Sequence, residues 1–203
     1  LKKEFSQKLD CARPIEDLSL IIEEASRCKN IVANLLNFAR QGKLNLEQIN
    51  LKELIAEQLK QIKMVPSAGD VELILESSNG FVIEGDRDQL KQVFLNILNN
   101  ACESMEDIPN KKVIISLESD GENIITKIKD SGCGIPKENI GKIFTPFFTT
   151  KKIGKGTGLG LAISYGIIKM HSGNITFESS PGVGTTFKIK LPNHLTPHGQ
   201  YLN

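Results

Sequence analysis

The sequence lacks any strong excess of charge and any long apolar run. Its net charge is +1, which provides no overall field toward nucleic acid or an anionic membrane, so we expect neither as a partner. No run reaches the ~18 apolar residues of a membrane-spanning helix, and we expect no membrane segment in this chain. Hydrophobic residues make up 39% of the 203 residues and charged residues 24%, which is typical of a soluble globular protein.

Cysteines are few and scattered. None of the four forms a C-x-x-C pair, so the sequence indicates neither a disulfide framework nor a cysteine metal site: Cys11, Cys28, Cys102 and Cys133. Reduced thiols in a cytoplasmic protein are the expectation. Residue 1 is leucine within a polar segment, and a signal peptide is lacking. We therefore expect a fragment of a longer protein, and the sequence leaves open whether the full-length protein carries a membrane anchor.

Residues 15 to 39 form one predicted helix with a heptad seam. Its apolar residues alternate at spacings of three and four: Leu18, Ile21, Ala25, Cys28, Val32, Leu35 and Ala39. A packing helix within a single domain can show such a seam. A seam of this length, placed ahead of a separate domain, favours a dimerising helical bundle.

From residue 44 onward the pattern is mixed. We expect helices at 50–62, 86–105 and 158–170, the first opened by a capping box of Asn50 and Glu53. We expect strands at 44–49, 71–76, 81–85, 112–119, 123–130, 174–179 and 185–192. Strands grouped in hairpins with helices between them predict an α+β fold, an α/β sandwich with one mixed sheet covered by helices on one face. Residues 193 to 203 show no periodicity, and we expect a flexible tail.

Three polar residues share a stripe of the predicted helix 86–105. Asn96, Asn100 and Glu103 recur at i, i+4 and i+7, beside the apolar face. A solvent-exposed helix face would explain the stripe. Asparagine, however, has only a moderate helix propensity and is a less favourable residue for a helix surface that has no function. An asparagine oxygen is a hard, neutral ligand suited to Mg²⁺, so the stripe is a candidate cation site.

The segment D-S-G-C-G-I at 130–135 directly follows a predicted strand. The carboxylate of Asp130 can accept a hydrogen bond from an exocyclic amine such as that of adenine. Gly132 and Gly134 lack the Cβ atoms that would keep a planar ligand away from the backbone. An ordinary turn at the end of a strand has a similar composition, so this segment alone leaves both readings open.

A glycine-rich segment, G-K-G-T-G-L-G-L at 154–161, leads directly into an apolar helix. The free N–H groups at the start of that helix suit a phosphate group. The spacing differs from that of a Walker A loop and from that of the dinucleotide-binding fingerprint. A flexible linker would seldom lead straight into an apolar helix, so we predict a phosphate-binding loop.

Taken in order, these segments resemble the conserved boxes of sensor histidine kinases. N-I-L-N-N-A at 96–101 resembles the N box, and D-S-G-C-G-I resembles the G1 box. I-F-T-P-F-F-T-T-K at 143–151 resembles the F box, and G-K-G-T-G-L-G-L resembles the G2 box. P-G-V-G-T-T-F at 181–187 is similar to the closing G-x-G-T-x-F segment. The resemblance covers about residues 15 to 192.

The resemblance implies a Bergerat-type fold of the GHKL superfamily, with three helices on one face of a mixed sheet, that binds ATP and Mg²⁺. It makes Asn100 the Mg²⁺ ligand, with Asn96 and Glu103 on the phosphate side. It assigns the base to Asp130, Gly132, Gly134, Ile135 and Thr185. It assigns the phosphates to Lys151, Gly156, Thr157, Gly158, Leu159, Gly160 and Leu161, with Lys152 and Lys155 as competitors of Lys151. Residues 136 to 157 would form an ATP lid anchored by Phe144, Phe147 and Phe148.

The resemblance also implies a function and a domain organisation. A histidine kinase transfers the γ-phosphate of ATP to a histidine, for relay to an aspartate of a response regulator. Residues 1–43 would be the C-terminal part of a homodimeric dimerisation and phosphotransfer hairpin, 44–192 the catalytic ATP-binding domain, and 193–203 the tail. The histidines are His171, His194 and His198, none at the phosphoacceptor position, so we expect the acceptor outside this fragment.

Two alternatives remain open at this point. The chain could be a nucleotide-binding module without phosphotransfer, or another ATPase or serine kinase of the same superfamily.

Overall fold

The computed structural model describes residues 21–22, 44–65, 68–77, 81–106, 108–151 and 156–194. The chain divides into two compact units, Leu1–Arg40 and Gln41–Asn203. In the first unit only Ile21 and Ile22 are described, and both are helical with exposed side chains. Apart from these two residues, the predicted dimerising helix lies outside the described residues.

The second unit contains a five-stranded sheet with the order β2 (Glu72–Glu76), β4 (Lys112–Ser119), β5 (Asn123–Asp130), β7 (Gly184–Pro192) and β6 (Asn174–Ser180). β2 runs parallel to β4, and the other neighbours are antiparallel. The sheet is therefore mixed, as predicted. β4 and β5 form the expected hairpin with the expected bounds.

Two predicted strands lie outside this sheet, so the expectation of one single sheet was wrong. β1 (Leu46–Asn50) and β3 (Val82–Asp86) pair with each other as an antiparallel ribbon. Their register places Ile49 opposite Ile83, and both side chains are buried. The ribbon thus buries its own apolar pair, and the strand pattern alone could not tell which partner β3 would take.

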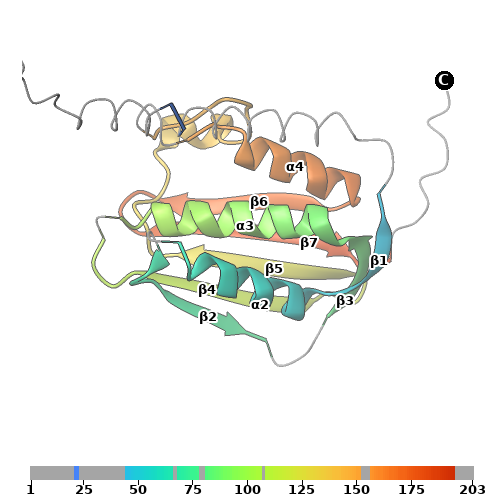
Figure 1. Cartoon of the computed structure of the whole chain (residues 1–203). Helices are drawn as coiled ribbons and strands as arrows, with labels where there is room; N and C mark the ends of the chain where they lie inside the picture. Colours follow the sequence, from blue (N-terminus) through green and yellow to red (C-terminus); the bar gives the residue numbers. More distant parts are fainter. Residues whose placement is uncertain are drawn as a thin grey trace, which may run out of the picture. The chain divides into compact units, whose positions relative to one another are not determined.

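Three helices cover one face of the five-stranded sheet, as Figure 1 shows. They are α2 (Leu51–Ile62), α3 (Arg87–Glu103) and α4 (Gly160–Met170), with α3 between the other two. The apolar stripe of α3 is fully buried in this core: Leu90, Val93, Phe94, Ile97 and Leu98. The mixed sheet with helices on one face confirms the predicted fold class.

A side-chain cap at Asn50 explains where α2 begins. Asn50 Oδ1 accepts hydrogen bonds from the backbone N atoms of Lys52 and Glu53 at 3.1 and 3.4 Å. The side-chain amide of Asn50 in turn donates to Glu53 Oε1 at 2.9 Å. This reciprocal pair is the predicted capping box, with the asparagine amide in place of the backbone donor.

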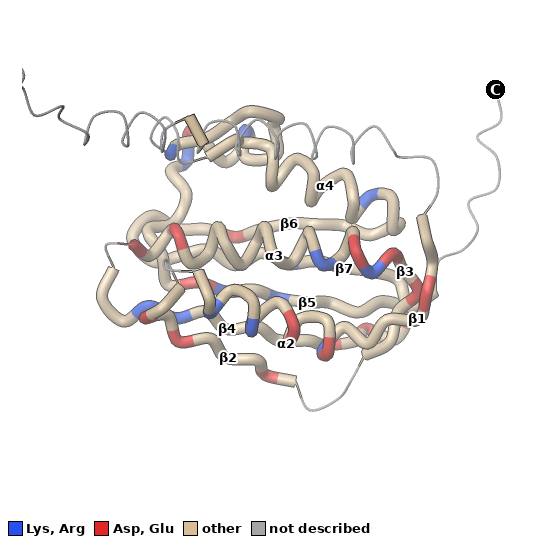
Figure 2. The backbone as a smooth tube through the Cα atoms, in the orientation of Figure 1, with Lys and Arg blue, Asp and Glu red and all other residues tan. Residues whose placement is uncertain are grey.

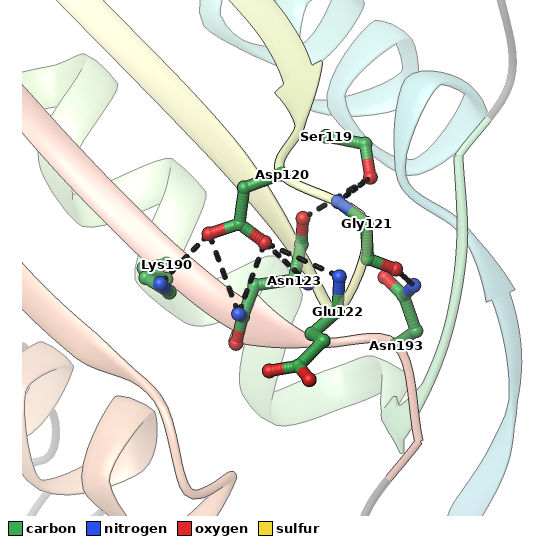
Figure 3. A network of polar contacts seen from close by, with 7 residues as sticks. All are labelled: Ser119, Asp120, Gly121, Glu122, Asn123, Lys190 and Asn193. Atoms are coloured by element: carbon green, nitrogen blue, oxygen red, sulfur yellow. Dashed lines mark hydrogen bonds and ion pairs between the residues drawn. The ribbon is translucent and has the colours of Figure 1, made fainter.

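The β4–β5 turn is held by a polar network, drawn in Figure 3. Asp120 accepts from the backbone N of Asn123 at 2.9 Å and pairs with Lys190 Nζ at 2.8 Å. Asn193, the first residue of the predicted tail, donates through its backbone N to Glu122 O and through Nδ2 to Gly121 O. These two hydrogen bonds hold Asn193 against the β4–β5 hairpin. Residues 195–203 lie outside the described residues.

A buried histidine joins the end of α4 to the start of α3. His171 ends α4 and is 1% exposed. Its Nε2 accepts from the backbone N of Asp86 at 2.9 Å, so the hydrogen lies on Nδ1, which contacts Ile167 O at 2.8 Å. Asp86 itself caps α3 by accepting from Gln89 N. Because both ring nitrogens are engaged, His171 has a structural role.

Candidate functional site

Asp130, at the end of β5, is the most buried carboxylate of the predicted site. Its side chain is enclosed, and its residue is 4% exposed. Oδ1 accepts from Gly132 N at 2.9 Å, Thr185 N at 3.1 Å and Ser104 Oγ at 3.4 Å. Among the described residues, no protein donor contacts Oδ2. Burial raises the pKa of this carboxyl, while the three donors to Oδ1 oppose that shift.

Two glycines around Asp130 are required by the packing of the protein itself. A Cβ on Gly132 would overlap Ser104 Oγ. A Cβ on Gly134, whose φ is +71°, would overlap the carbonyl oxygen of Ser180. The sequence explains both glycines by the approach of a planar ligand, and internal close packing now provides a second, independent reason.

Ser179 connects the remaining residues of the base end. Its Oγ accepts from Ile135 N at 2.8 Å and lies 2.9 Å from Thr185 Oγ1. Thr185 N donates to Asp130, so one continuous network contains Ile135, Ser179, Thr185 and Asp130. The structure thus brings together the residues assigned to the base: Asp130, Gly132, Gly134, Ile135 and Thr185.

A second group lies where α3 meets the end of the F box. Lys151 Nζ donates to Asn100 Oδ1 at 3.0 Å and forms an ion pair with Glu103. Asn100 and Glu103 therefore direct their oxygen atoms at a single cationic group. A Cβ on Gly156 would lie 3.1 Å from Lys151 Cδ, so the glycine-rich loop returns over the lysine side chain. Lys152 and Lys155 lie outside the described residues.

Asn96 has a different neighbour from Asn100. Its Nδ2 donates to Gly160 O at 3.2 Å and to Ser164 Oγ at 3.4 Å, joining α3 to the first turn of α4. No side chain among the described residues caps the start of α4. The first backbone N–H groups of a helix have no intrahelical acceptor, so this end is suited to an anion.

The glycine-rich loop packs onto the F box at Gly158. This glycine has a φ of +67°, and a Cβ there would lie 2.7 Å from the backbone oxygen of Phe147. Thr157 Oγ1 accepts from Leu159 N at 3.3 Å just before α4. The predicted phosphate residues from 156 to 161 thus lead directly into α4, which begins at Gly160.

The predicted lid contains a 3₁₀ helix, η2 (Lys137–Lys142), which the sequence pattern did not indicate. Figure 2 shows basic residues along this part of the chain. Phe144 packs between Tyr165 of α4 and Phe177 of β6, with ring centroids 5.3 and 5.9 Å apart, so its predicted anchoring role is confirmed. The same prediction was wrong for Phe147, whose side chain is 64% exposed and whose φ is +66°. Its strained backbone packs against Gly158 and turns the ring outward.

A comparison with known protein families identifies the family to which this site belongs. The family described as "Histidine kinase-, DNA gyrase B-, and HSP90-like ATPase" matches residues 85–195, from the end of β3 through β7. This range is more than half of the 203 residues and contains both groups of site residues. The chain belongs to this ATPase family.

Relatives of this ATPase chain are sensor kinases. The signal transduction histidine-protein kinase AtoS of Escherichia coli (strain K12) is 38% identical over 185 residues, which are 91% of this chain and 30% of AtoS. The catalytic domain of histidine kinase ThkA aligns with a TM-score of 0.65 and 34% identity, over 74% of this chain and 99% of that domain. ThkA in complex with the response regulator protein TrrA aligns with a TM-score of 0.73 and 30% identity, over 98% of this chain and 55% of that one.

The chain therefore contains an ATP-binding catalytic domain of the sensor histidine kinase type, a member of the GHKL superfamily. The chain spans less than a third of the length of AtoS. Within the described part of this kinase domain, no helix is long and apolar enough to cross a membrane.

Two serines of the kinase domain's site were not predicted. Ser104 contacts Asp130 from the end of α3, and Ser179 contacts Ile135 and Thr185 from β6. Ser179 belongs to an ordinary strand pattern and carries no local signal. Ser104 lies four residues after Asn100 and continues the i, i+4 spacing of Asn96 and Asn100, so the stripe could have pointed to it.

Proposed function

We propose that this domain binds Mg-ATP and transfers the γ-phosphate to a histidine on another segment, as the kinase relatives' names suggest. The observation that carries the proposal is the asymmetry of Asp130. Three protein donors hold Oδ1, and Oδ2 is left for a ligand. An exocyclic amine, as in adenine, is a donor that matches this acceptor.

The opposite end of the proposed site would hold the phosphates and a cation. Asn100 and Glu103 already converge on one ammonium group, so this donor set is compatible with a cation. We propose that Asn100 is the protein ligand of Mg²⁺, which would neutralise phosphate charge and complete its coordination with phosphate oxygens and water. Lys151 and the uncapped start of α4 would stabilise the remaining phosphate charge.

In the proposed reaction an imidazole nitrogen attacks the γ-phosphorus as the bond from that phosphorus to the ADP oxygen breaks. The products are a phosphohistidine and ADP. The side chains of this domain perform no covalent step themselves. Asp130 orients the base, while Asn100, Lys151 and α4 hold the phosphates in line, so the rate enhancement rests on positioning and charge neutralisation.

The wider assembly is likewise a proposal. We propose a homodimer formed through the heptad seam of residues 15–39, in a cytoplasmic part of the full-length protein. The phosphohistidine would pass its phosphate to an aspartate of a response regulator. The ThkA relative, which was solved together with a response regulator, supports this choice of partner.

Nucleotide binding tests the metal assignment directly. Asn100→Asp places a second negative charge beside Glu103, and we expect affinity for ATP in the presence of Mg²⁺ to fall at least tenfold, as measured by calorimetry. Asn99→Asp is the matched control, because the neighbouring position points about 100° away around α3. Unchanged Mg-ATP affinity in Asn100→Asp would remove Asn100 as the ligand.

Phosphotransfer needs a separate test. The chain is incubated with ATP labelled at the γ-phosphate and with a histidine-bearing helical hairpin from a related kinase, supplied in trans. Acid-labile label on the hairpin is the expected result. Tight ATP binding without any transferred label would favour a nucleotide-binding module over a kinase.

A further inference from the structure

Ser104, the residue that ends α3, contacts the base end of the proposed site through both its backbone and its side chain. Its backbone N donates to Asn100 O at 3.0 Å, and its carbonyl oxygen accepts from Cys133 N at 3.1 Å. Its Oγ donates to Ala101 O at 2.7 Å and, more weakly, to Asp130 Oδ1 at 3.4 Å, so its single hydrogen is shared between the two acceptors. The serine thus links the helix of the polar stripe to the turn that follows Asp130.

Close packing fixes the place of this hydroxyl. A Cβ built on Gly132 would overlap Ser104 Oγ and would lie 2.8 Å from Ser104 Cβ and 2.9 Å from Asp130 Oδ1. Ser104, Gly132 and the carboxylate of Asp130 therefore meet at one point. The absence of a side chain at Gly132 provides the room in which the Ser104 hydroxyl reaches the carboxylate.

We propose that Ser104 is a positioning residue for recognition of an adenine-type base. Its hydroxyl helps to hold Asp130 Oδ1 inside the protein, which keeps Oδ2 turned toward the exocyclic amine of the base. Because Ser104 immediately follows Glu103, it also ties the base end of the site to the cation end through the last turn of α3. This inference rests on the proposed ATP binding.

The hydroxyl makes the longest of the three contacts to Asp130 Oδ1 and shares its one hydrogen with Ala101 O, so its removal has a limited effect. Gly132 N and Thr185 N would remain on Oδ1 in Ser104→Ala. The carboxylate would lose one stabilising donor, and its pKa, already raised by burial, would rise further. Protonated Asp130 would no longer offer an ionised acceptor, so the loss of affinity would grow as the pH falls.

A titratable thiol lies close enough to this carboxylate to affect the pH profile. Cys102, on α3, is buried, and its thiol pKa is raised to about 11 by burial and by the charges of Glu103 and Asp130. The thiol therefore stays neutral in acidic and neutral solution. The pH dependence of nucleotide affinity in that range can therefore be compared between Ser104→Ala and the unmodified chain. A difference between the two reports on Asp130.

The test compares Ser104→Ala with Ser131→Ala in the 203-residue chain. Ser131 adjoins Asp130 in sequence, but its Oγ contacts Lys112 N and Asn110 O. Affinities for ATP and for GTP are measured by calorimetry between about pH 5 and about pH 8. Guanine is the informative competitor because it presents a carbonyl oxygen where adenine presents its amine.

We expect Ser104→Ala to bind ATP about three- to tenfold more weakly, with a reduced preference for ATP over GTP and a steeper loss toward acidic pH. Ser131→Ala should retain both the preference and the pH profile, even if its melting temperature falls. Equal losses for ATP and GTP in Ser104→Ala, or an unchanged profile, would overturn the positioning role. Failure of the unmodified chain to bind ATP would instead overturn the proposed function.

Discussion

Lys151 Nζ donates to Oδ1 of Asn100 at 3.0 Å, although the two residues are 51 positions apart in the sequence. Lys151, the last residue of the F box, therefore contacts α3, the helix that carries the proposed metal ligand. The contact unites two residues that the sequence assigns to different partners, a phosphate and a cation. In the chain alone, the ammonium group satisfies the amide oxygen of Asn100, and the loop at Gly156 packs over the lysine side chain.

Replacing Lys151 by glutamine should loosen the glycine-rich loop. The ion pair with Glu103 is half-exposed, so we expect the free energy of unfolding to change by less than about 1 kcal/mol. Backbone hydrogen exchange from Gly156 to Leu159, measured without nucleotide, should nevertheless become faster. Lys127→Gln removes a comparable exposed ion pair, with Glu118, and should leave that exchange unchanged. Equal exchange rates in both variants would show that the Lys151 side chain does not stabilise the glycine-rich loop.

Replacing Asp130 by asparagine should abolish ATP binding while stabilising the fold at neutral pH. Burial raises the pKa of this carboxyl, so the folded chain binds its proton more tightly than the unfolded chain does. Ionisation above that pKa therefore costs stability, and an uncharged amide removes the cost. The amide also presents a donor where the base amine needs an acceptor. The measurements are ATP affinity and melting temperature, and a variant that binds ATP tightly would contradict the assignment.

His171 should make the fold sensitive to acid. Burial lowers its pKa below the ordinary 6.5, so as the pH falls the unfolded chain takes up this proton first. The free energy of unfolding should therefore decrease as the pH falls below about 6.5, because protonation removes the acceptor for Asp86 N. His171→Gln should be less stable at neutral pH but should show a flatter pH dependence.

The exposed His194 provides the control for this pH experiment. Denaturant unfolding of His194→Gln should follow the pH dependence of the unmodified chain. If His171→Gln retained the full acid sensitivity, other groups would have to be responsible for it.

Thr126→Val should stabilise the kinase domain. Thr126 lies in β5, is 1% exposed, and its Oγ1 has no hydrogen-bond partner among the described residues. Valine keeps the branched shape and removes the buried, unpaired hydroxyl, so we expect a gain of about 1 kcal/mol in the free energy of unfolding. Thr176→Val, at an exposed position of β6, should change it much less. A loss of stability in Thr126→Val would show that the hydroxyl is satisfied in solution.

Sequence patterns predicted the elements that depend on near neighbours. The capping box at Asn50 and the β4–β5 hairpin around Asp120 and Gly121 form as expected, because each depends on residues within a few positions of one another. Amphipathic spacing predicted the buried face of α3 for the same reason. The resemblance to the histidine kinase boxes then supplied roles for Asn100 and Asp130 that no periodicity could supply.

By itself, the sequence determined the order of these elements, the family and the candidate site residues, since period, turn chemistry and box spacing are all local. Only the tertiary structure decided that β3 pairs with β1, that Lys151 meets Asn100, and that Ser104 fills the space left by Gly132. Lys151 and Asn100 are 51 positions apart in the sequence, and Ser104 and Gly132 are 28 positions apart. Close packing selects such partners by shape and hydrogen bonding in three dimensions, which local sequence spacing does not record.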